Sequence, residues 1–203
     1  MICVFFTILT SSMAGYVFAR MYFPGAKVIF TAFSTLMFVS FGAITIYPTF
    51  DVLNVLGMSD SLWGLIVMKI FGVSTVNIYL VRSYVRTLPQ GMEEAAQIDG
   101  CSVIGTFFRI VMPLLKPIIA TITILSFQAS WNEYLLPTLF TLTRPDQRTL
   151  IVGVAALKSS SKAAVAWNLM LAGSTIALVP VLIVYAFANK YFVKGIAAGA
   201  VKG

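Results

Sequence analysis

Five long apolar runs limit what this chain can fold into. Together they contain only two charged side chains, Lys69 and Glu133. Each run is long enough to cross about 30 Å of hydrocarbon as an α-helix, which takes roughly 20 mainly apolar residues. The sequence therefore predicts an all-α membrane protein with five transmembrane helices, at residues 1–19, 28–47, 62–81, 117–140 and 167–188.

The composition agrees with a membrane protein. Of the 203 residues, 59% are hydrophobic and only 10% are charged, whereas soluble domains carry about 25% charged residues. Backbone groups in lipid must find their hydrogen bonds within the segment, which favours helices. A β-barrel would alternate apolar and polar residues along each strand, and these runs do not. We expect residues 1–203 to form a single transmembrane domain.

The basic residues predict an orientation. The net charge is +7, but Lys and Arg lie mostly beside the apolar runs, so they indicate topology rather than nucleic-acid binding. The positive-inside rule places nine of them in the cytoplasm: Arg20, Lys27, Arg82, Arg86, Arg109, Lys116, Lys190, Lys194 and Lys202. The outer side receives one longer loop, residues 141–166, with Arg144, Arg148, Lys158 and Lys162. This predicts a cytoplasmic C-terminus.

The same orientation puts Met1 on the outer side, inside an apolar run. A signal peptide would carry a basic segment before its apolar part, and the first basic residue is Arg20. We therefore expect that an earlier span precedes this chain in a longer protein. The alternative is a five-helix protein that starts here.

One polar stretch interrupts the apolar runs, "EEAAQIDGCSVIGTFFRIVMPLLKP" at residues 93–117. Glu93 and Glu94 suit the first turn of a short helix, whose positive end they complement. Gly100 is expected to end that helix and Ser102 to cap a second one. In the second helix Val103, Phe107 and Ile110 share an apolar face, and Pro113 and Pro117 lead into the next span.

Such an element lies on the membrane surface or projects into a partner. Interfacial helices usually carry a strongly basic polar face. This one begins with Glu93, Glu94 and Asp99, which anionic headgroups repel. The charge pattern favours a protein partner.

The stretch closely resembles the EAA loop of ABC-importer permeases. The residues at the positions of this loop's pattern are Glu94, Ala95, Ala96, Gly100, Ile110, Met112 and Pro113. Two departures are Met112, where the family has Leu, and Cys101 after the glycine. "YVFARMYFPGAK", "SWNEYLLPTLF" and "YFVKGIAAGAVKG" look like permeases of the maltose/maltodextrin type, so the resemblance covers essentially the whole chain. It implies the type I ABC importer permease fold, with six spans in the full family fold.

The resemblance also implies a function, a transmembrane permease subunit of an ATP-driven importer for a sugar or oligosaccharide. Residues 89–113 would form the coupling loop that docks on a cytoplasmic ATPase. The residues it assigns to coupling are Glu93, Glu94, Ala95, Ala96, Asp99, Gly100, Phe107 and Pro113. The implied partners are two copies of the ATPase, a second homologous permease and an extracytoplasmic solute-binding protein. The implied location is a bacterial or archaeal cytoplasmic (inner) membrane.

We expect no catalysis, metal or cofactor on this chain, with ATP and Mg used by the partner ATPase. A P-loop needs glycines followed by Gly-Lys-Ser/Thr, and no such string occurs. "GIAAG" at residues 195–199 lacks the lysine and also fits a helix-packing motif.

Polar residues inside spans are costly and often functional. The candidates for a substrate path are Lys69, Asn77, Gln128, Trp131, Asn132 and Glu133. Gln128, Trp131 and Asn132 share one helical face, where amides beside an aromatic ring suit a sugar. For this group the structural alternative is an interfacial Trp with interhelical hydrogen bonds near the outer membrane boundary. For Asn77 it is a bond between helices, and for Lys69 it is snorkelling.

Other classes stay open at this point. An importer for another solute fits the same loop. An ion-gradient secondary transporter would use intramembrane acids, of which only Glu133 is present. An intramembrane enzyme finds no support, because there is no His and no nucleophile or metal set at suitable spacing.

Overall fold

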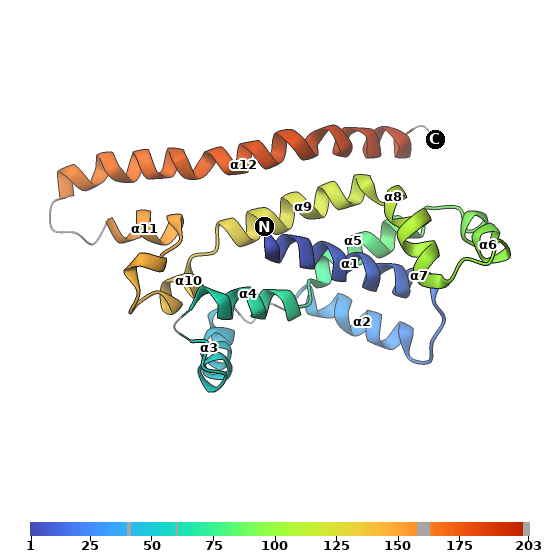
Figure 1. Ribbon diagram of the computed structural model, residues 1–203, viewed down its shortest axis with the longest axis horizontal. Helices are drawn as coiled ribbons and strands as arrows, with labels where there is room; N and C mark the ends of the chain where they lie inside the picture. Colours follow the sequence, from blue (N-terminus) through green and yellow to red (C-terminus); the bar gives the residue numbers. More distant parts are fainter. Residues whose placement is uncertain (40–41, 60, 158–162, 201–203) are drawn as a thin grey trace. The chain divides into compact units, whose positions relative to one another are not determined.

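The computed structural model describes residues 1–39, 42–59, 61–157 and 163–200. Lys158, Lys162 and Lys202, which were counted in predicting the membrane orientation, lie outside the described residues. Every regular element in the described part is a helix (Figure 1). The first nine elements are α1 (Ile2–Arg20), α2 (Ala26–Leu36), η1 (Gly42–Thr45), α3 (Ile46–Val55), α4 (Leu62–Phe71), α5 (Thr75–Val85), α6 (Gly91–Ile98), α7 (Val103–Thr106) and η2 (Phe107–Val111).

The remaining elements follow the polar stretch. They are α8 (Met112–Leu114), α9 (Lys116–Trp131), α10 (Leu135–Phe140), η3 (Pro145–Gln147), α11 (Leu150–Ala156) and α12 (Ala163–Ala200). Among all the elements, η2 is a π-helical turn, and η1 and η3 are 3-10 turns.

In the described residues, three helical segments are long and apolar enough to cross a membrane: Ile2–Arg20, Leu62–Val85 and Trp167–Ala188. A fourth is present if Val103–Leu114 and Lys116–Trp131, which meet at 80°, count as one bent span. The all-helical membrane class is confirmed at this level. The number of candidate spans is three or four, where the sequence predicts five.

Residues 28–47 account for much of that difference. Instead of one continuous helix, α2 ends at Leu36 after 11 residues, and α3 begins at Ile46 and runs on to Val55. Pro48 occupies the first turn of α3. Proline has no N–H to donate and is tolerated there, but it would break a helix in its interior. A new helix therefore begins just before the proline.

Residues 117–140 also divide in two. Here α9 begins at Lys116, with Pro117 in its first turn as expected, and it ends at Trp131. A short α10 follows at Leu135, with Pro137 as its third residue. By contrast α12 is longer than the predicted 167–188 and continues through Pro180 for 38 residues.

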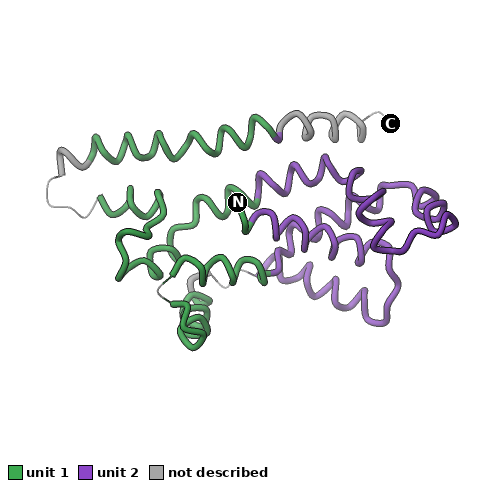
Figure 2. The backbone as a smooth tube through the Cα atoms, in the orientation of Figure 1, with its two compact units in different colours: residues 1–3, 41–72, 126–187 green, residues 4–40, 73–125, 188–203 purple. Residues whose placement is uncertain are grey.

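The chain divides into two compact units (Figure 2). Unit 2 comprises residues 4–40, 73–125 and 188–203. Its core is a cluster of buried apolar side chains: Tyr16, Val81, Val85, Phe107, Val111, Leu115 and Ile122. In this unit α1 and α5 approach closely at Gly15, where an added Cβ would lie 2.6 Å from Val81 Cγ1. Only glycine lets the two backbones come this near.

Unit 1 comprises residues 1–3, 41–72 and 126–187. Its core forms around Leu53, Leu65 and Phe140, with the Phe50 ring 5.5 Å from that of Phe140. Here α11 and α12 meet closely at Gly173, whose added Cβ would lie 2.5 Å from Val154 Cγ2. Within the apolar segment Trp167–Ala188, a stretch of 18 residues has only 6% of its residues buried. A helix that is apolar on all sides is typical of a membrane span.

Candidate functional site

The polar stretch forms the helix and turn that its sequence predicts. Glu93 and Glu94 lie in the first turn of α6. The helix ends at Ile98, and Gly100 follows with a φ of 80°. That left-handed conformation suits glycine, since other residues meet a steric penalty between Cβ and the backbone. The backbone here reverses sharply between two short helices.

The second helix starts at its predicted cap. Ser102 Oγ accepts a hydrogen bond from the Gly105 N–H over 3.1 Å. The expected apolar face is only partly right, because Val103 is 44% exposed while Phe107 is buried. The buried residues that follow Phe107 are Val111 and Leu115. The π-helical turn at Phe107–Val111 changes the helical register, so that Val111 rather than Ile110 is the next fully buried residue after Phe107.

Glu93 points into unit 2. Its Oε1 accepts from Arg20 Nε over 2.8 Å, and its Oε2 accepts from the Tyr16 hydroxyl over 3.0 Å. Arg20 also donates from Nη2 to the Leu88 carbonyl over 2.6 Å. The Arg20 and Glu93 side chains are only 9% and 10% exposed. Three hydrogen bonds thus hold the first turn of α6, and the segment before it, to the end of α1.

Sequence reasoning grouped Glu93 with the docking residues and did not identify Tyr16 or Arg20. The available signal was the "YVFAR" segment, where Tyr16 and Arg20 are four residues apart and share one face of a helix. A partner acid 73 residues away in sequence was not deducible from that spacing alone.

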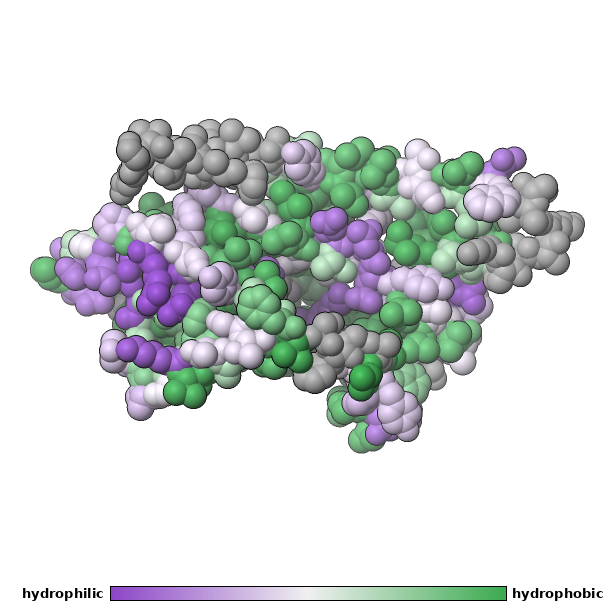
Figure 3. Space-filling model, turned by 180° about the vertical axis from the view of Figure 1, so that it is seen from behind, coloured by the Kyte–Doolittle hydropathy of each residue, from purple (hydrophilic) through white to green (hydrophobic). Residues whose placement is uncertain are grey.

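The other face of α6 is open. Glu94, Ala95, Gln97 and Asp99 are exposed, and Ile98 is 86% exposed. Ala96 lies on the inner face with 4% exposure. Figure 3 shows hydrophilic residues gathered at the end of the unit that carries α6. The exposed surface therefore combines two acidic side chains, Glu94 in the first turn and Asp99 just after the helix, with the apolar side chain of Ile98.

Lys69 and Glu133, which sequence reasoning considered separately, form an ion pair in unit 1. Lys69 Nζ lies 3.7 Å from Glu133 Oε2 and 3.5 Å from Ser130 Oγ. The two side chains are 25% and 31% exposed. The pair leaves this part of the apolar helices without net charge.

Trp131 binds to a neighbouring helix rather than facing open space. Its Nε1–H donates to the Ala177 carbonyl of α12 over 3.0 Å, and its ring stacks on Phe127 at 5.5 Å. Trp131 thus makes an interhelical hydrogen bond, as its structural alternative expects, and its place on a substrate path stays a prediction.

Gln128 and Asn132, two of the three residues expected on one helical face, lie at the same cavity, whose described lining residues do not include Trp131. Both line a cavity of about 480 Å³ in unit 1, between α9, α11 and α12. The rest of its wall is mostly aliphatic, with Ser174 as a further polar group. Asn77 is 5% exposed and belongs to unit 2. In the described residues, no group of three or more His, Cys, Asp or Glu side chains is placed to hold a metal ion.

Comparison with known proteins identifies what this arrangement is similar to. Residues 5–198 match the family model described as binding-protein-dependent transport system inner membrane component. The chain is 36% identical over 202 residues to the arabinooligosaccharides transport system permease protein AraQ of Bacillus subtilis (strain 168), covering 98% of this chain and 70% of that protein.

Two further similarities extend this result. The chain is 35% identical to the maltodextrin transport system permease protein MdxG of Bacillus subtilis (strain 168), covering 95% of this chain and 68% of that protein. Among solved structures, a bacterial ABC transporter involved in the import of the acidic polysaccharide alginate matches with a TM-score of 0.71 and 26% identity. That match covers 93% of this chain and 71% of the other.

Proposed function

The chain belongs to the family of binding-protein-dependent transport system inner membrane components, and we propose that it is the permease subunit of an ATP-driven importer for an oligosaccharide. Two relatives named for oligosaccharide transport, at 36% and 35% identity across nearly the whole chain, support this substrate class. The chain is a transport subunit, and ATP hydrolysis belongs to a partner.

One observation carries the coupling role, namely the two opposite faces of α6. Glu93 and Ala96 face inward, where Glu93 is bonded to α1. Glu94, Ala95 and Ile98 face outward and are exposed. A helix bonded on one face and open on the other is suited to docking on the cytoplasmic ATPase. Glu94 supplies the charged contact, and Gly100 supplies the turn that makes the helix project.

The inward contacts supply a route for movement. When two ATPase copies close on ATP, the docked α6 moves with them. The Arg20–Glu93 ion pair makes α1 move as well, and Phe107, Val111 and Leu115 pack in the same core as Val81 and Val85 of α5. ATP then biases a two-state equilibrium of the spans through contacts that differ between the states, as coupling requires.

The substrate path is assigned to the cavity lined by Gln128 and Asn132. Two amides and the Ser174 hydroxyl give donors and acceptors for sugar hydroxyls within a largely aliphatic wall. A second homologous permease subunit completes the pathway, and an extracytoplasmic binding protein delivers the solute.

The orientation follows from the basic residues. Arg20, Arg82 and Arg86 lie at the ends of two candidate spans, Ile2–Arg20 and Leu62–Val85. The positive-inside rule places these ends, α6 and the C-terminus in the cytoplasm of a bacterial or archaeal cell.

The deciding experiment tests α6 as the docking element. The chain is co-expressed with its partner permease and ATPase, and copurification is compared for the wild type and Glu94→Lys. We expect the permease pair to be retained and the ATPase to be lost. Asp146→Lys, an equal charge change in η3, serves as the control and should keep the ATPase. ATPase recovery that is the same for Glu94→Lys and wild type would overturn the docking assignment.

A further inference from the structure

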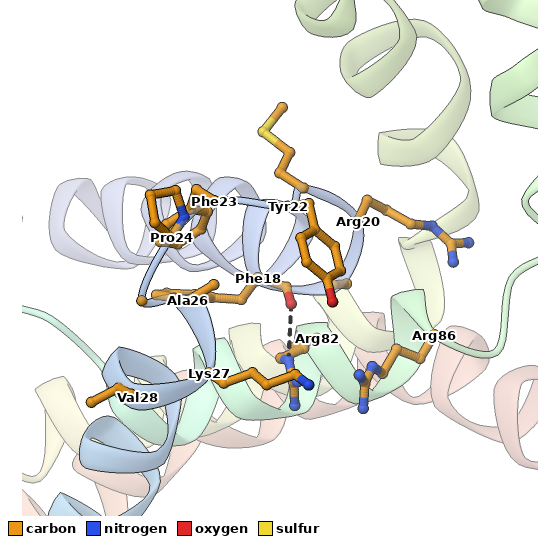
Figure 4. A pocket seen from close by; sticks show the side chains of 13 residues that line it. Phe18, Arg20, Tyr22, Phe23, Pro24, Ala26, Lys27, Val28, Arg82 and Arg86 are labelled. Atoms are coloured by element: carbon orange, nitrogen blue, oxygen red, sulfur yellow. Dashed lines mark hydrogen bonds between the residues drawn. The ribbon is translucent and has the colours of Figure 1, made fainter.

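A basic cavity of about 480 Å³ lies in unit 2, and none of the described residues that line it belongs to α6. It is formed where α1 ends, where α2 begins and along the last turn of α5 (Figure 4). In Figure 4, Lys27 reaches from α2 toward Arg82, Arg86 extends beside Arg82, and Arg20 points away to the other side. Three cationic side chains thus converge on one hollow.

The charges in this cavity are not balanced from within. No acidic side chain is among the described residues that line it. Arg20 is engaged by Glu93, whereas no ion pair in the described part of the chain involves Lys27, Arg82 or Arg86. Like charges gathered in one hollow repel one another, so an anion held between them is stabilised by all three.

Arg82 is fixed in place to serve such an anion. Its Nε donates to the Phe18 carbonyl over 3.1 Å, as the dashed line in Figure 4 shows. Its guanidinium carbon lies 3.6 Å from the centre of the Phe30 ring, within range of a cation–π interaction. These two contacts hold the side chain while its terminal nitrogens stay available. Lys27 and Arg86 are exposed and can adjust around a ligand.

The position of the cavity relative to the membrane distinguishes a lipid headgroup from a free phosphate ion as the ligand. Candidate spans end at Arg20 and at Val85, which places the cavity where the chain leaves the hydrocarbon and enters the headgroup layer. Beside Lys27, α2 exposes Val28 (73%) and Ile29 (42%), an apolar surface next to the charged one. A free phosphate ion needs the charges alone, whereas a lipid also needs a surface for its acyl chains.

We propose that the cavity of Lys27, Arg82 and Arg86 binds the phosphate of an anionic phospholipid headgroup, with the acyl chains against the exposed apolar side chains of α2. Basic pockets between transmembrane helices on the cytoplasmic side suit such headgroups. The leaflet follows from the orientation proposed above, but binding itself depends only on the cavity and on membrane insertion.

The test uses the assembled transporter, purified in detergent and depleted of lipid. Phosphatidylglycerol is then added back, and native mass spectrometry measures how much of it the transporter retains, with phosphatidylcholine and inorganic phosphate as competing probes. Lys27→Gln/Arg86→Gln removes two exposed charges and leaves the Arg82 contacts intact. We expect phosphatidylglycerol retention to fall roughly 25-fold, because each basic residue near an anionic lipid contributes about fivefold. Unchanged retention would overturn the proposal.

A matched variant separates the cavity from general charge. Arg109→Gln/Lys116→Gln removes two exposed basic residues that do not line the cavity, and it should retain phosphatidylglycerol as the wild type does. An equal loss in this variant, or equal retention of phosphatidylcholine by the wild type, would contradict the site. Displacement of phosphatidylglycerol by inorganic phosphate at the same concentration would identify free phosphate as the ligand and overturn the lipid assignment. The readout needs no ATP hydrolysis, so it is independent of the Glu94→Lys result.

Discussion

Arg20 at the end of α1 donates from Nε to Glu93 Oε1 over 2.8 Å and so joins the first turn of α6 to a candidate membrane-spanning helix. Both side chains are about nine-tenths buried, and the Tyr16 hydroxyl completes the coordination of the carboxylate. A buried ion pair with additional hydrogen bonds fixes geometry more than it adds stability. In the proposed mechanism, its role is to make α1 follow the movement of α6.

The first prediction concerns this pair. Arg20→Met leaves the Glu93 carboxylate buried without its cation, and breaking such a pair costs about 3–5 kcal/mol. We expect a lower thermal midpoint for the purified transporter and less transport per ATP hydrolysed, with the ATPase still bound. Uptake and hydrolysis are measured together in proteoliposomes.

Reversal of the charges provides the control for the first prediction. Arg20→Glu/Glu93→Arg restores an attractive pair and should recover part of the transport-to-hydrolysis ratio lost in Arg20→Glu alone. Normal coupling in Arg20→Met, with a normal thermal midpoint, would show that the contact has no role in moving α1.

The second prediction concerns the turn after α6. Gly100 has a φ of 80°, and an added Cβ would meet no atom within 4 Å, so the backbone conformation alone requires glycine. Gly100→Val should insert into the membrane normally and lose transport, because a strained conformation of this kind costs of order 1–3 kcal/mol and the turn will relax. Gly91→Ala, also free of close contacts but without a positive φ, should transport normally. Full transport by Gly100→Val would show that transport does not depend on glycine in this turn.

The third prediction concerns the contact between α1 and α5. Gly15→Ala places a Cβ 2.6 Å from Val81 Cγ1 and 3.0 Å from the Arg82 backbone nitrogen, so the helices must separate. Overpacking of this kind costs about 1–3 kcal/mol, which thermal unfolding in detergent will detect. Adding Val81→Ala should recover part of the loss. Gly153→Ala, with nothing within 4 Å, is the control, and an equal loss there would contradict the packing argument.

The fourth prediction separates cavity residues from their neighbour. Gln128→Ala and Asn132→Ala should raise the substrate concentration needed for half-maximal uptake, because both amides line the cavity of unit 1. Trp131→Phe should leave that concentration unchanged and lower stability by about 1 kcal/mol through loss of its hydrogen bond to Ala177. Concentration-dependent uptake and thermal unfolding give the two readouts. If Trp131→Phe raised the half-maximal uptake concentration while Gln128→Ala and Asn132→Ala did not, Trp131 rather than the two amides would contact the substrate.

Local features of the candidate site could be predicted from the sequence. The end of α6 shortly before Gly100 and the cap at Ser102 depend on the chemistry of single residues and their near neighbours. The apolar face of the next helix was predicted less well, since a π-helical turn at Phe107–Val111 changes a register that periodicity treats as constant.

Features that depend on distant residues could not be predicted in this way. From the sequence alone, Glu93 is predicted to be an acid that contacts the ATPase. Its bonds to Arg20 and Tyr16, which are far away along the chain, are seen only in the folded structure. Residues 28–47 carry no charge and are mainly apolar, so their composition does not show that α2 stops at Leu36. From the sequence, the Trp131 ring beside two amides suggests a surface for a sugar. Its hydrogen bond to the Ala177 carbonyl of α12 is seen only in the folded structure.

The Lys69–Glu133 contact has an electrical consequence. A single charge that crosses the full membrane potential changes energy by roughly 2.3 kcal/mol per 100 mV. Lys69 and Glu133, held 3.7 Å apart, move as a neutral unit and transfer no net charge when the helices shift. The membrane voltage therefore has little to act on in this part of the protein, and uptake driven by ATP should continue when the potential is collapsed.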